Sequence, residues 1–109
     1  MDANRDAERW GALADGARWA IVACLADGPR AVGELAAGLP VSRSAVSQHL
    51  KILKDAGLVE DTAAGTRRIY RLNPAALAAL RDQLDTYWQR ALAGYTEAAE
   101  APSMDTGEA

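Results

Sequence analysis

The sequence predicts a mainly α-helical fold that carries one small β-hairpin. Apolar residues recur at three- and four-residue spacings over most of the chain, which is typical of helices that bury one face. Residues 58–72 instead hold two runs rich in strand-forming side chains on either side of Gly65. The chain has 109 residues, a length that suits one domain with a core of modest size.

Four short helices are expected in the first half of the chain. Asp15 and Ser42 suit helix N-caps, because their side chains accept hydrogen bonds from the unpaired N–H groups of a first turn. Gly28 and Gly57 suit the ends of the helices that follow these caps. The helices are expected within residues 6–13, 15–29, 31–38 and 42–57. A break at residues 38–40, Gly-Leu-Pro, separates the last two, so these two helices form a helix-turn-helix.

The second half predicts a hairpin followed by one long helix. Residues 58–62 and 66–72 favour strands, with a short loop between them. Asn73 as cap and Pro74 at the first helical position then begin a helix that runs to about Glu100. A hairpin that follows a helix-turn-helix makes the fold a winged helix-turn-helix.

Composition places the chain among ordinary globular proteins, with 50% hydrophobic and 25% charged residues. No apolar run is long enough for a transmembrane helix, and the first residues lack the apolar stretch of a signal peptide. The single Cys24 fits a reducing compartment. We therefore expect a cytoplasmic protein without a membrane partner, with one domain over residues 1–100 and a flexible tail over residues 101–109.

The distribution of charge points to nucleic acid, although the formal net charge is −3. Residues 41–72 hold six basic and three acidic side chains, whereas the segments on either side are acidic. A local basic patch decides phosphate contact more than the overall charge does.

One face of the expected fourth helix is suited to the major groove of DNA. On a helical wheel, Val46, Leu50 and Leu53 share one side and are expected to face the core. The opposite side is polar and carries no bulky side chain; it consists of Ser44, Ser47, Gln48 and Lys51. Glutamine can read adenine with two hydrogen bonds, and an arginine such as Arg43 at the helix start can read guanine or hold a phosphate. The following strand adds a basic wing of Arg67, Arg68 and Arg71. Together these features predict a DNA-binding protein.

The residues of this region resemble the ArsR family of winged-helix repressors. The run LPVSRSAVSQHLKILKDAGLVEDTAAGTRRIYRLNPAAL carries the resemblance, and ADGARWAIVACLADGPRAVGELAAGL extends it upstream. It covers about residues 8–95. The resemblance implies a homodimer joined through the first and last helices, a two-fold symmetric operator and repression that a signal relieves. By motif position, the DNA-contacting residues would be Arg43, Ser44, Ser47, Gln48 and His49, with Arg67 and Arg68 on the wing.

A dimer interface is also expected from the last helix itself. Its apolar residues form one stripe, too apolar to leave in water and too long for the rest of the domain to cover. The first helix is expected to lie alongside. The expected interface residues are Trp10, Leu13, Leu77, Leu80, Leu84, Trp88 and Tyr95.

The sequence departs from the metal-sensing members of that family. It has no Cys-x-Cys pair, and Cys24 and His49 are its only cysteine and histidine. Asp82 and Asp85 on the last helix have no histidine partner, so carboxylate–imidazole chelation is not supplied. We therefore expect a metal-independent regulator with no metal site and no cofactor.

Several alternatives stay open at this point. His49 packs against backbone or contacts DNA, Cys24 is buried or responds to oxidation, and the aromatic residues form a dimer core or line a pocket for a small-molecule inducer. No nucleophile with a base and no glycine-rich phosphate loop is present, so we expect no enzyme. The competing function is a protein-interaction module on a winged-helix scaffold. The operator sequence, the regulated genes and the inducing signal do not follow from the sequence.

Overall fold

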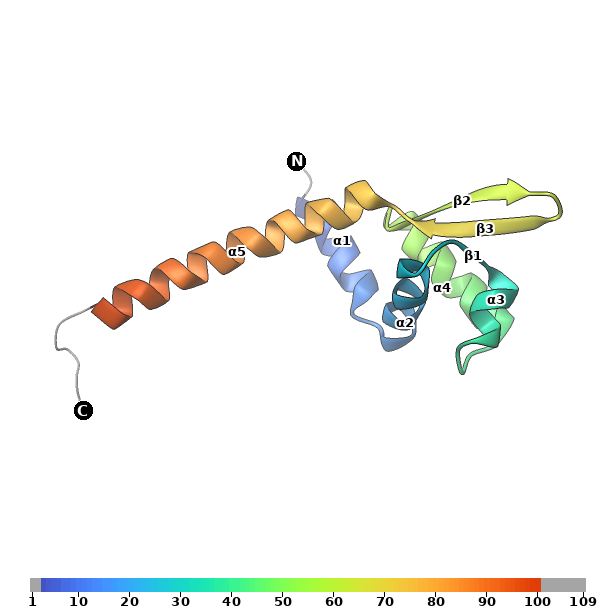
Figure 1. The fold of residues 1–109 in the computed structure, drawn as a ribbon, viewed down its shortest axis with the longest axis horizontal. Helices are drawn as coiled ribbons and strands as arrows, with labels where there is room; N and C mark the ends of the chain where they lie inside the picture. Colours follow the sequence, from blue (N-terminus) through green and yellow to red (C-terminus); the bar gives the residue numbers. More distant parts are fainter. Residues whose placement is uncertain (1–2, 101–109) are drawn as a thin grey trace. The chain divides into compact units, whose positions relative to one another are not determined.

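The computed structural model describes residues 3–100, which form five helices and a three-stranded sheet (Figure 1). The elements are α1 (Ala3–Leu13), α2 (Gly16–Ala26), β1 (Arg30–Ala31), α3 (Val32–Ala37), α4 (Arg43–Asp55), β2 (Val59–Ala64), β3 (Arg67–Leu72) and α5 (Pro74–Glu100). The expected mainly helical fold with a small hairpin is confirmed. The expected tail, residues 101–109, lies outside the described residues. The chain divides into two compact units, one up to Ala79 and one from Leu80 onward, and each is described by itself.

The helix ends lie where the capping residues predict them. The Asp15 carboxylate accepts hydrogen bonds from the backbone N–H groups of Ala17 and Arg18, at 2.8 and 3.1 Å. Ser42 Oγ accepts from the N–H group of Ala45 at 3.1 Å. Gly57 follows α4 with a φ of 81°, a conformation that favours glycine. The beginnings of α2 and α4 and the turn that ends α4 therefore follow from residue types that can be read from the sequence.

The first unit contains one antiparallel sheet with the strand order β1-β3-β2. In the hairpin, Ala64 pairs with Arg67, which leaves a two-residue loop with Gly65 at a φ of 66°. The strand therefore continues through residues 63–64, which the sequence assigned to the loop. β1 was not expected; its two residues pair with Tyr70 and Ile69 of β3, and so short a segment carries no periodic pattern.

The core of the first unit lies between α2, α3, α4 and the beginning of β2. Its largest fully buried side chains are Ile21, Leu35, Val46, Leu50, Leu53 and Leu58. Trp19 of α2 is 60% exposed and stands outside this core. Since α4 contributes three of the buried residues, its apolar side is held against the core and its polar side is left on the surface.

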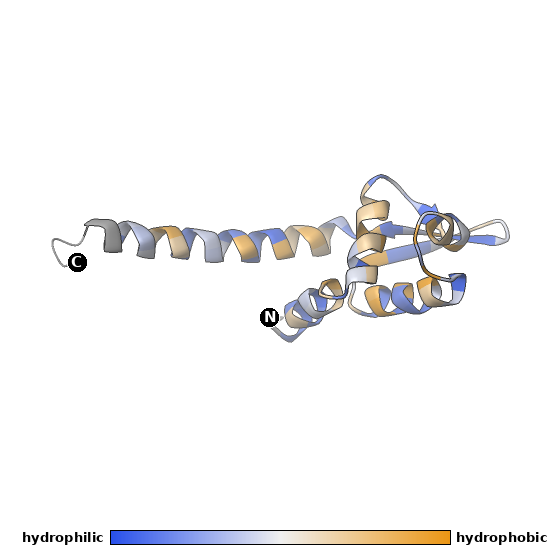
Figure 2. Cartoon of the chain, turned by 90° about the horizontal axis from the view of Figure 1, so that it is seen from below, coloured by the Kyte–Doolittle hydropathy of each residue, from blue (hydrophilic) through white to orange (hydrophobic). Residues whose placement is uncertain are grey.

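The second unit consists of α5 from Leu80 onward. The expected long helix is confirmed, with 27 residues from Pro74 to Glu100. Figure 2 shows apolar residues recurring along it between polar ones. Several large apolar side chains are exposed: Leu84, Tyr87, Trp88, Leu92 and Tyr95. No helix within residues 3–100 has the length and apolar character needed to cross a membrane.

Candidate nucleic-acid interface

The outward face of α4 presents unoccupied polar side chains. Arg43, Ser44, Ser47 and Gln48 are all exposed, whereas Val46 on the other side of the helix is fully buried. Within residues 4–97, no hydrogen bond or ion pair occupies the side chains of these four exposed residues. Their donors and acceptors are therefore available to a ligand, as direct contact with base edges requires.

Some of the predicted base-contacting and wing residues line one groove of about 860 Å³, whereas Gln48, His49 and Arg71 do not line it. Arg43, Ser44 and Ser47 contribute to it from α4, and Arg67 and Arg68 contribute from the wing. The groove is completed by Ala31, Val32, Gly33, Glu34, Ala37, Thr66 and Tyr70. The structure thus brings together residues that stand twenty or more positions apart in the sequence.

Each of the wing arginines forms an ion pair, which the sequence did not reveal. Arg67 forms an ion pair with Glu34 of α3 at 3.1 Å, and Arg71 pairs with Glu60 at 3.3 Å. Arg68 pairs with Asp61 at 3.2 Å. Each arginine of this strand therefore lies beside a carboxylate.

Asp61 joins the wing to the end of α4. Its carboxylate pairs with Lys54 Nζ at 2.9 Å and with Arg68 at 3.2 Å, and its side chain is only 7% exposed. The hydrogen bond from Lys54 lowers the pKa of Asp61 below its ordinary value, and the charges of Lys54 and Arg68 act in the same direction. The ionised carboxylate thus holds one cation from the helix and one from the wing.

His49 contacts a side chain, whereas the sequence suggested backbone or DNA. Its Nδ1 lies 3.3 Å from Nη1 of Arg18. A guanidinium offers only donors, so Nδ1 accepts and the proton of the neutral ring is on Nε2. Arg18 Nε also donates to the carbonyl oxygen of Ala12 at 2.7 Å. Lys51, the remaining residue of the expected face, is exposed and pairs with Asp55 at 3.2 Å.

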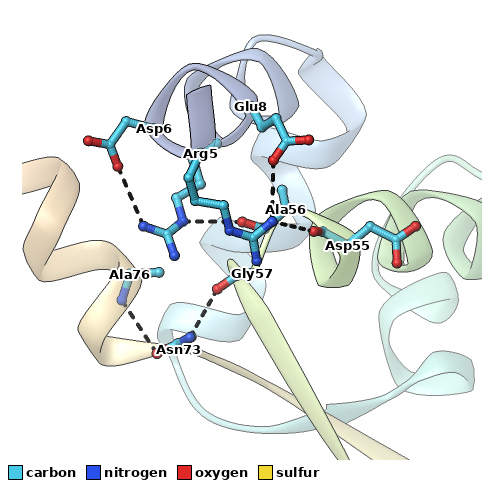
Figure 3. Close-up of polar contacts among 9 residues, drawn as sticks. Arg5, Asp6, Glu8, Asp55, Ala56, Gly57, Asn73 and Ala76 are labelled. Carbon is cyan, nitrogen blue, oxygen red and sulfur yellow. Dashed lines mark hydrogen bonds and ion pairs between the residues drawn. The ribbon is translucent and has the colours of Figure 1, made fainter. Parts of the chain in front are cut away.

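The C-terminal end of α4 is held by donors from other elements (Figure 3). Arg5 Nη1 donates to the carbonyl oxygen of Asp55 at 2.7 Å, and Arg9 Nε donates to that of Ala56 at 3.1 Å. Helix C-termini leave such carbonyl groups without partners and favour cations. The two arginines of α1 therefore stabilise the end of the helix whose face is exposed.

A third carbonyl at this junction is bound from the strand–helix connection. Asn73 Nδ2 donates to the carbonyl oxygen of Gly57 at 3.0 Å. The same side chain accepts from the N–H groups of Ala75 and Ala76, at 3.0 and 3.4 Å, as Figure 3 shows for Ala76. Asn73 therefore caps α5, as expected. It also binds the end of α4, a contact that its capping role alone did not indicate.

The residues expected at a dimer interface differ in exposure. Leu13 and Leu80 are buried within the single chain, at 8% and 3% exposure. Leu84, Trp88 and Tyr95 are 57%, 58% and 73% exposed, and Trp10 and Leu77 are half-buried. The apolar surface that α5 offers therefore lies mainly from Leu84 onward.

The remaining candidates are Cys24, the aromatic side chains of α5 and possible metal ligands. Cys24 is a half-buried free thiol, less enclosed than expected. Tyr87 and Trp88 line a hollow of about 570 Å³ on α5. Across the described part of the chain, no three His, Cys, Asp or Glu residues gather where they could hold a metal ion.

A helix-turn-helix, a basic hairpin beside it and an unoccupied polar face on the second helix define a winged helix-turn-helix DNA-binding protein. Residues 15–61 match the family model described as "Bacterial regulatory protein, arsR family". The chain is 60% identical over 107 residues to the HTH-type transcriptional regulator Rv2034 of Mycobacterium tuberculosis, covering 97% of this chain and 100% of the relative. The chain belongs to the ArsR family of bacterial transcriptional regulators.

Solved structures agree with this assignment. An ArsR-like transcriptional regulator from Rhodococcus sp. RHA1 is similar with a TM-score of 0.73 and 34% identity, over 90% of this chain and 95% of that one. The homodimeric winged helix-turn-helix DNA-binding domain Mb0332 from Mycobacterium bovis is similar with a TM-score of 0.66 and 34% identity, over 82% of both chains.

Proposed function

We propose that the protein is a cytoplasmic, homodimeric repressor without enzymatic activity, which binds an inverted-repeat operator through α4 and the wing. The observation that carries the proposal is the groove that Arg43, Ser44 and Ser47 of α4 line together with two wing arginines. Residues 1–100 act in this proposal as one DNA-binding and dimerisation domain.

Base reading is assigned to the beginning of α4. Arg43 makes a bidentate contact with guanine or holds a phosphate, and Gln48 reads adenine. Ser44 and Ser47 are short enough to let the helix approach the base edges. Lys51 contacts phosphate at the margin. The exposure of all these side chains supports this assignment.

Phosphate contact is assigned to the wing. Arg67 and Arg68 are more than half exposed, at 56% and 58% of their side chains. Contacts with phosphate fix the register of a protein on DNA without reading sequence. His49 contributes through its remaining ring nitrogen, while Nδ1 stays with Arg18.

Dimerisation is assigned to the exposed apolar side chains of α5, and the half-buried Trp10 and Leu77 are further candidates for the interface. The homodimeric state of the similar Mb0332 domain supports it. One short helix reads too few bases to select a site, and two-fold symmetry presents two such helices to successive major grooves. The dimer therefore supplies specificity as well as cover for apolar surface.

The inducing signal in this proposal is a small molecule and not a metal. Soft metals need two or more thiolates, and each chain carries the single Cys24. A small molecule bound in the hollow at Tyr87 and Trp88 would compete with the partner subunit for the same side chains.

The direct experiment is a gel shift with DNA from upstream of the protein's own gene, at two salt concentrations. The expected result is a shifted band that weakens as salt rises, because phosphate contacts release counterions. Stoichiometric Zn²⁺ in reducing buffer should leave the band in place. No shift at either salt concentration would contradict the proposed function, and release by Zn²⁺ would contradict the metal-independent part alone.

A further inference from the structure

A carboxylate lies inside the groove that the proposed function assigns to DNA. Glu34 of α3 lines this groove together with Arg43, Ser44 and Arg67. Its Oε1 lies 3.1 Å from Nη2 of Arg67 and also accepts a hydrogen bond from the backbone N–H of Ala31 at 2.8 Å. A negative charge therefore occupies the surface that phosphate groups would approach.

The negative charge of Glu34 does not depend on Arg67. The hydrogen bond from the Ala31 N–H group is the main cause that lowers the pKa of Glu34, and the charges of Arg67 and Arg30 contribute less. That bond belongs to the beginning of α3 and stays when Arg67 moves. The carboxylate thus remains ionised at neutral pH whether or not Arg67 is beside it.

The ion pair of Glu34 with Arg67 is of the kind that DNA can displace. The two side chains are 52% and 56% exposed, and an ion pair that is exposed to water contributes little free energy. The carboxylate beside Arg68 differs, because Asp61 is 7% exposed and holds two cations at once. The third carboxylate, Glu60, pairs with Arg71, which the proposed function does not assign to DNA. Glu34 is therefore the carboxylate that phosphate can displace from a DNA-contacting arginine.

We propose that Glu34 is an affinity-limiting residue, which competes with DNA phosphate for the guanidinium of Arg67. In the unbound protein Arg67 rests on Glu34, and phosphate must displace this carboxylate before the wing engages. The competition lowers affinity for any DNA sequence, since phosphate contacts are common to all of them. This inference rests on the proposed function, in which Arg67 contacts phosphate.

The variant that tests it is Glu34→Gln. Glutamine removes the charge but keeps a side-chain oxygen that can accept the hydrogen bond from the Ala31 N–H group, as glutamine does in capping boxes. Fluorescence anisotropy with a labelled random-sequence DNA duplex should give an affinity about two- to fivefold higher than the parent at low salt. The gain should shrink as salt rises, because screening weakens charge competition. Unchanged thermal melting would confirm that the fold is retained.

A double-mutant cycle identifies the residue through which Glu34 acts. If it acts through Arg67, Glu34→Gln should have no effect in the Arg67→Gln background. Asp82→Asn on α5 is the control, because it makes the same change of charge at an exposed position outside the groove. This control should bind like the parent.

The outcomes separate the inference from the function on which it rests. If Glu34→Gln raises DNA affinity equally in the parent and in the Arg67→Gln variant, or if Asp82→Asn raises it as much, the effect comes from the overall charge of the protein. Either result would overturn the proposal. An unchanged or lower affinity of Glu34→Gln would also overturn it. If Arg67→Gln binds the duplex as tightly as the parent, the assignment of the wing to DNA fails instead.

Discussion

The face of α4 and its C-terminal end use their polar groups in opposite ways. On the face, the side chains of Arg43, Ser44, Ser47 and Gln48 are without partners among the residues described. At the end, three successive carbonyl groups, residues 55–57, each accept a side-chain donor. The difference shows how a helix can be anchored firmly by one terminus while its contact surface stays open to a ligand.

The anchoring donors come from the two elements that the proposed dimer uses. Arg5 and Arg9 belong to α1, and Asn73 caps α5. A fixed α1 and a fixed beginning of α5 therefore fix the end of α4 as well.

The largest effect is expected from a change outside α4. Replacing Leu84 and Trp88 by glutamate leaves its face and its end unchanged but puts charge on the exposed stripe of α5. Dimerisation and operator binding should both be abolished, because one subunit alone reads too few bases. Light scattering and gel shifts measure the two effects. The control is glutamate at Thr86 and Gln89, on the opposite side of the helix, which should leave dimerisation and operator binding intact. Loss of dimerisation and operator binding in this control would contradict the assigned stripe.

The next largest effect is expected at the anchored end. Gly57→Ala puts a side chain at a φ of 81°, where its Cβ would also meet the guanidinium of Arg5. The free energy of unfolding should fall by about 2 kcal/mol, as measured by urea denaturation. The control is Gly11→Ala, which lies inside α1 with nothing near the added Cβ and should not destabilise. Equal stability of Gly57→Ala and the parent would contradict the strained end.

The smallest effect is expected where the wing joins α4, and it depends on pH. The pKa of Asp61 is lowered in the folded protein, so its stabilisation is complete above its ordinary pKa of 3.8 and is lost as pH falls through the lower folded value. Asp61→Asn should therefore make the loss of stability below that ordinary pKa shallower than in the parent. Asp82→Asn, at an exposed pair, should change this profile less. Identical acid unfolding of parent and Asp61→Asn would contradict the role of the carboxylate.

The sequence predicted what local chemistry decides. The caps Asp15, Ser42 and Asn73, the terminating Gly57 and the buried side of α4 all follow from residue type and helical spacing, and all are confirmed. The partners that lie far along the chain were missed. Periodicity carries no information on which carboxylate reaches an arginine from another element.

Three such partners decide the character of the candidate site. Glu34 reaches Arg67, β1 pairs with β3, and the arginines of α1 reach the end of α4. Each depends on the packed fold, so the sequence alone showed a basic wing where the structure has arginines beside carboxylates. The unoccupied face of α4 was predicted because it needs only the position of the core.

The central claim is that the open face of α4 reads bases, and operator affinity measured beside stability tests it most directly. Arg43→Ala and Gln48→Ala should each weaken operator binding by about 1–3 kcal/mol and relax the preference at one base pair. Urea denaturation should show no loss of stability in either variant, because both side chains are exposed and without partners among the residues described. Arg81→Ala on α5 is the matched loss of an exposed arginine and should bind like the parent. Parent-like affinity and base preference in both α4 variants would contradict the account.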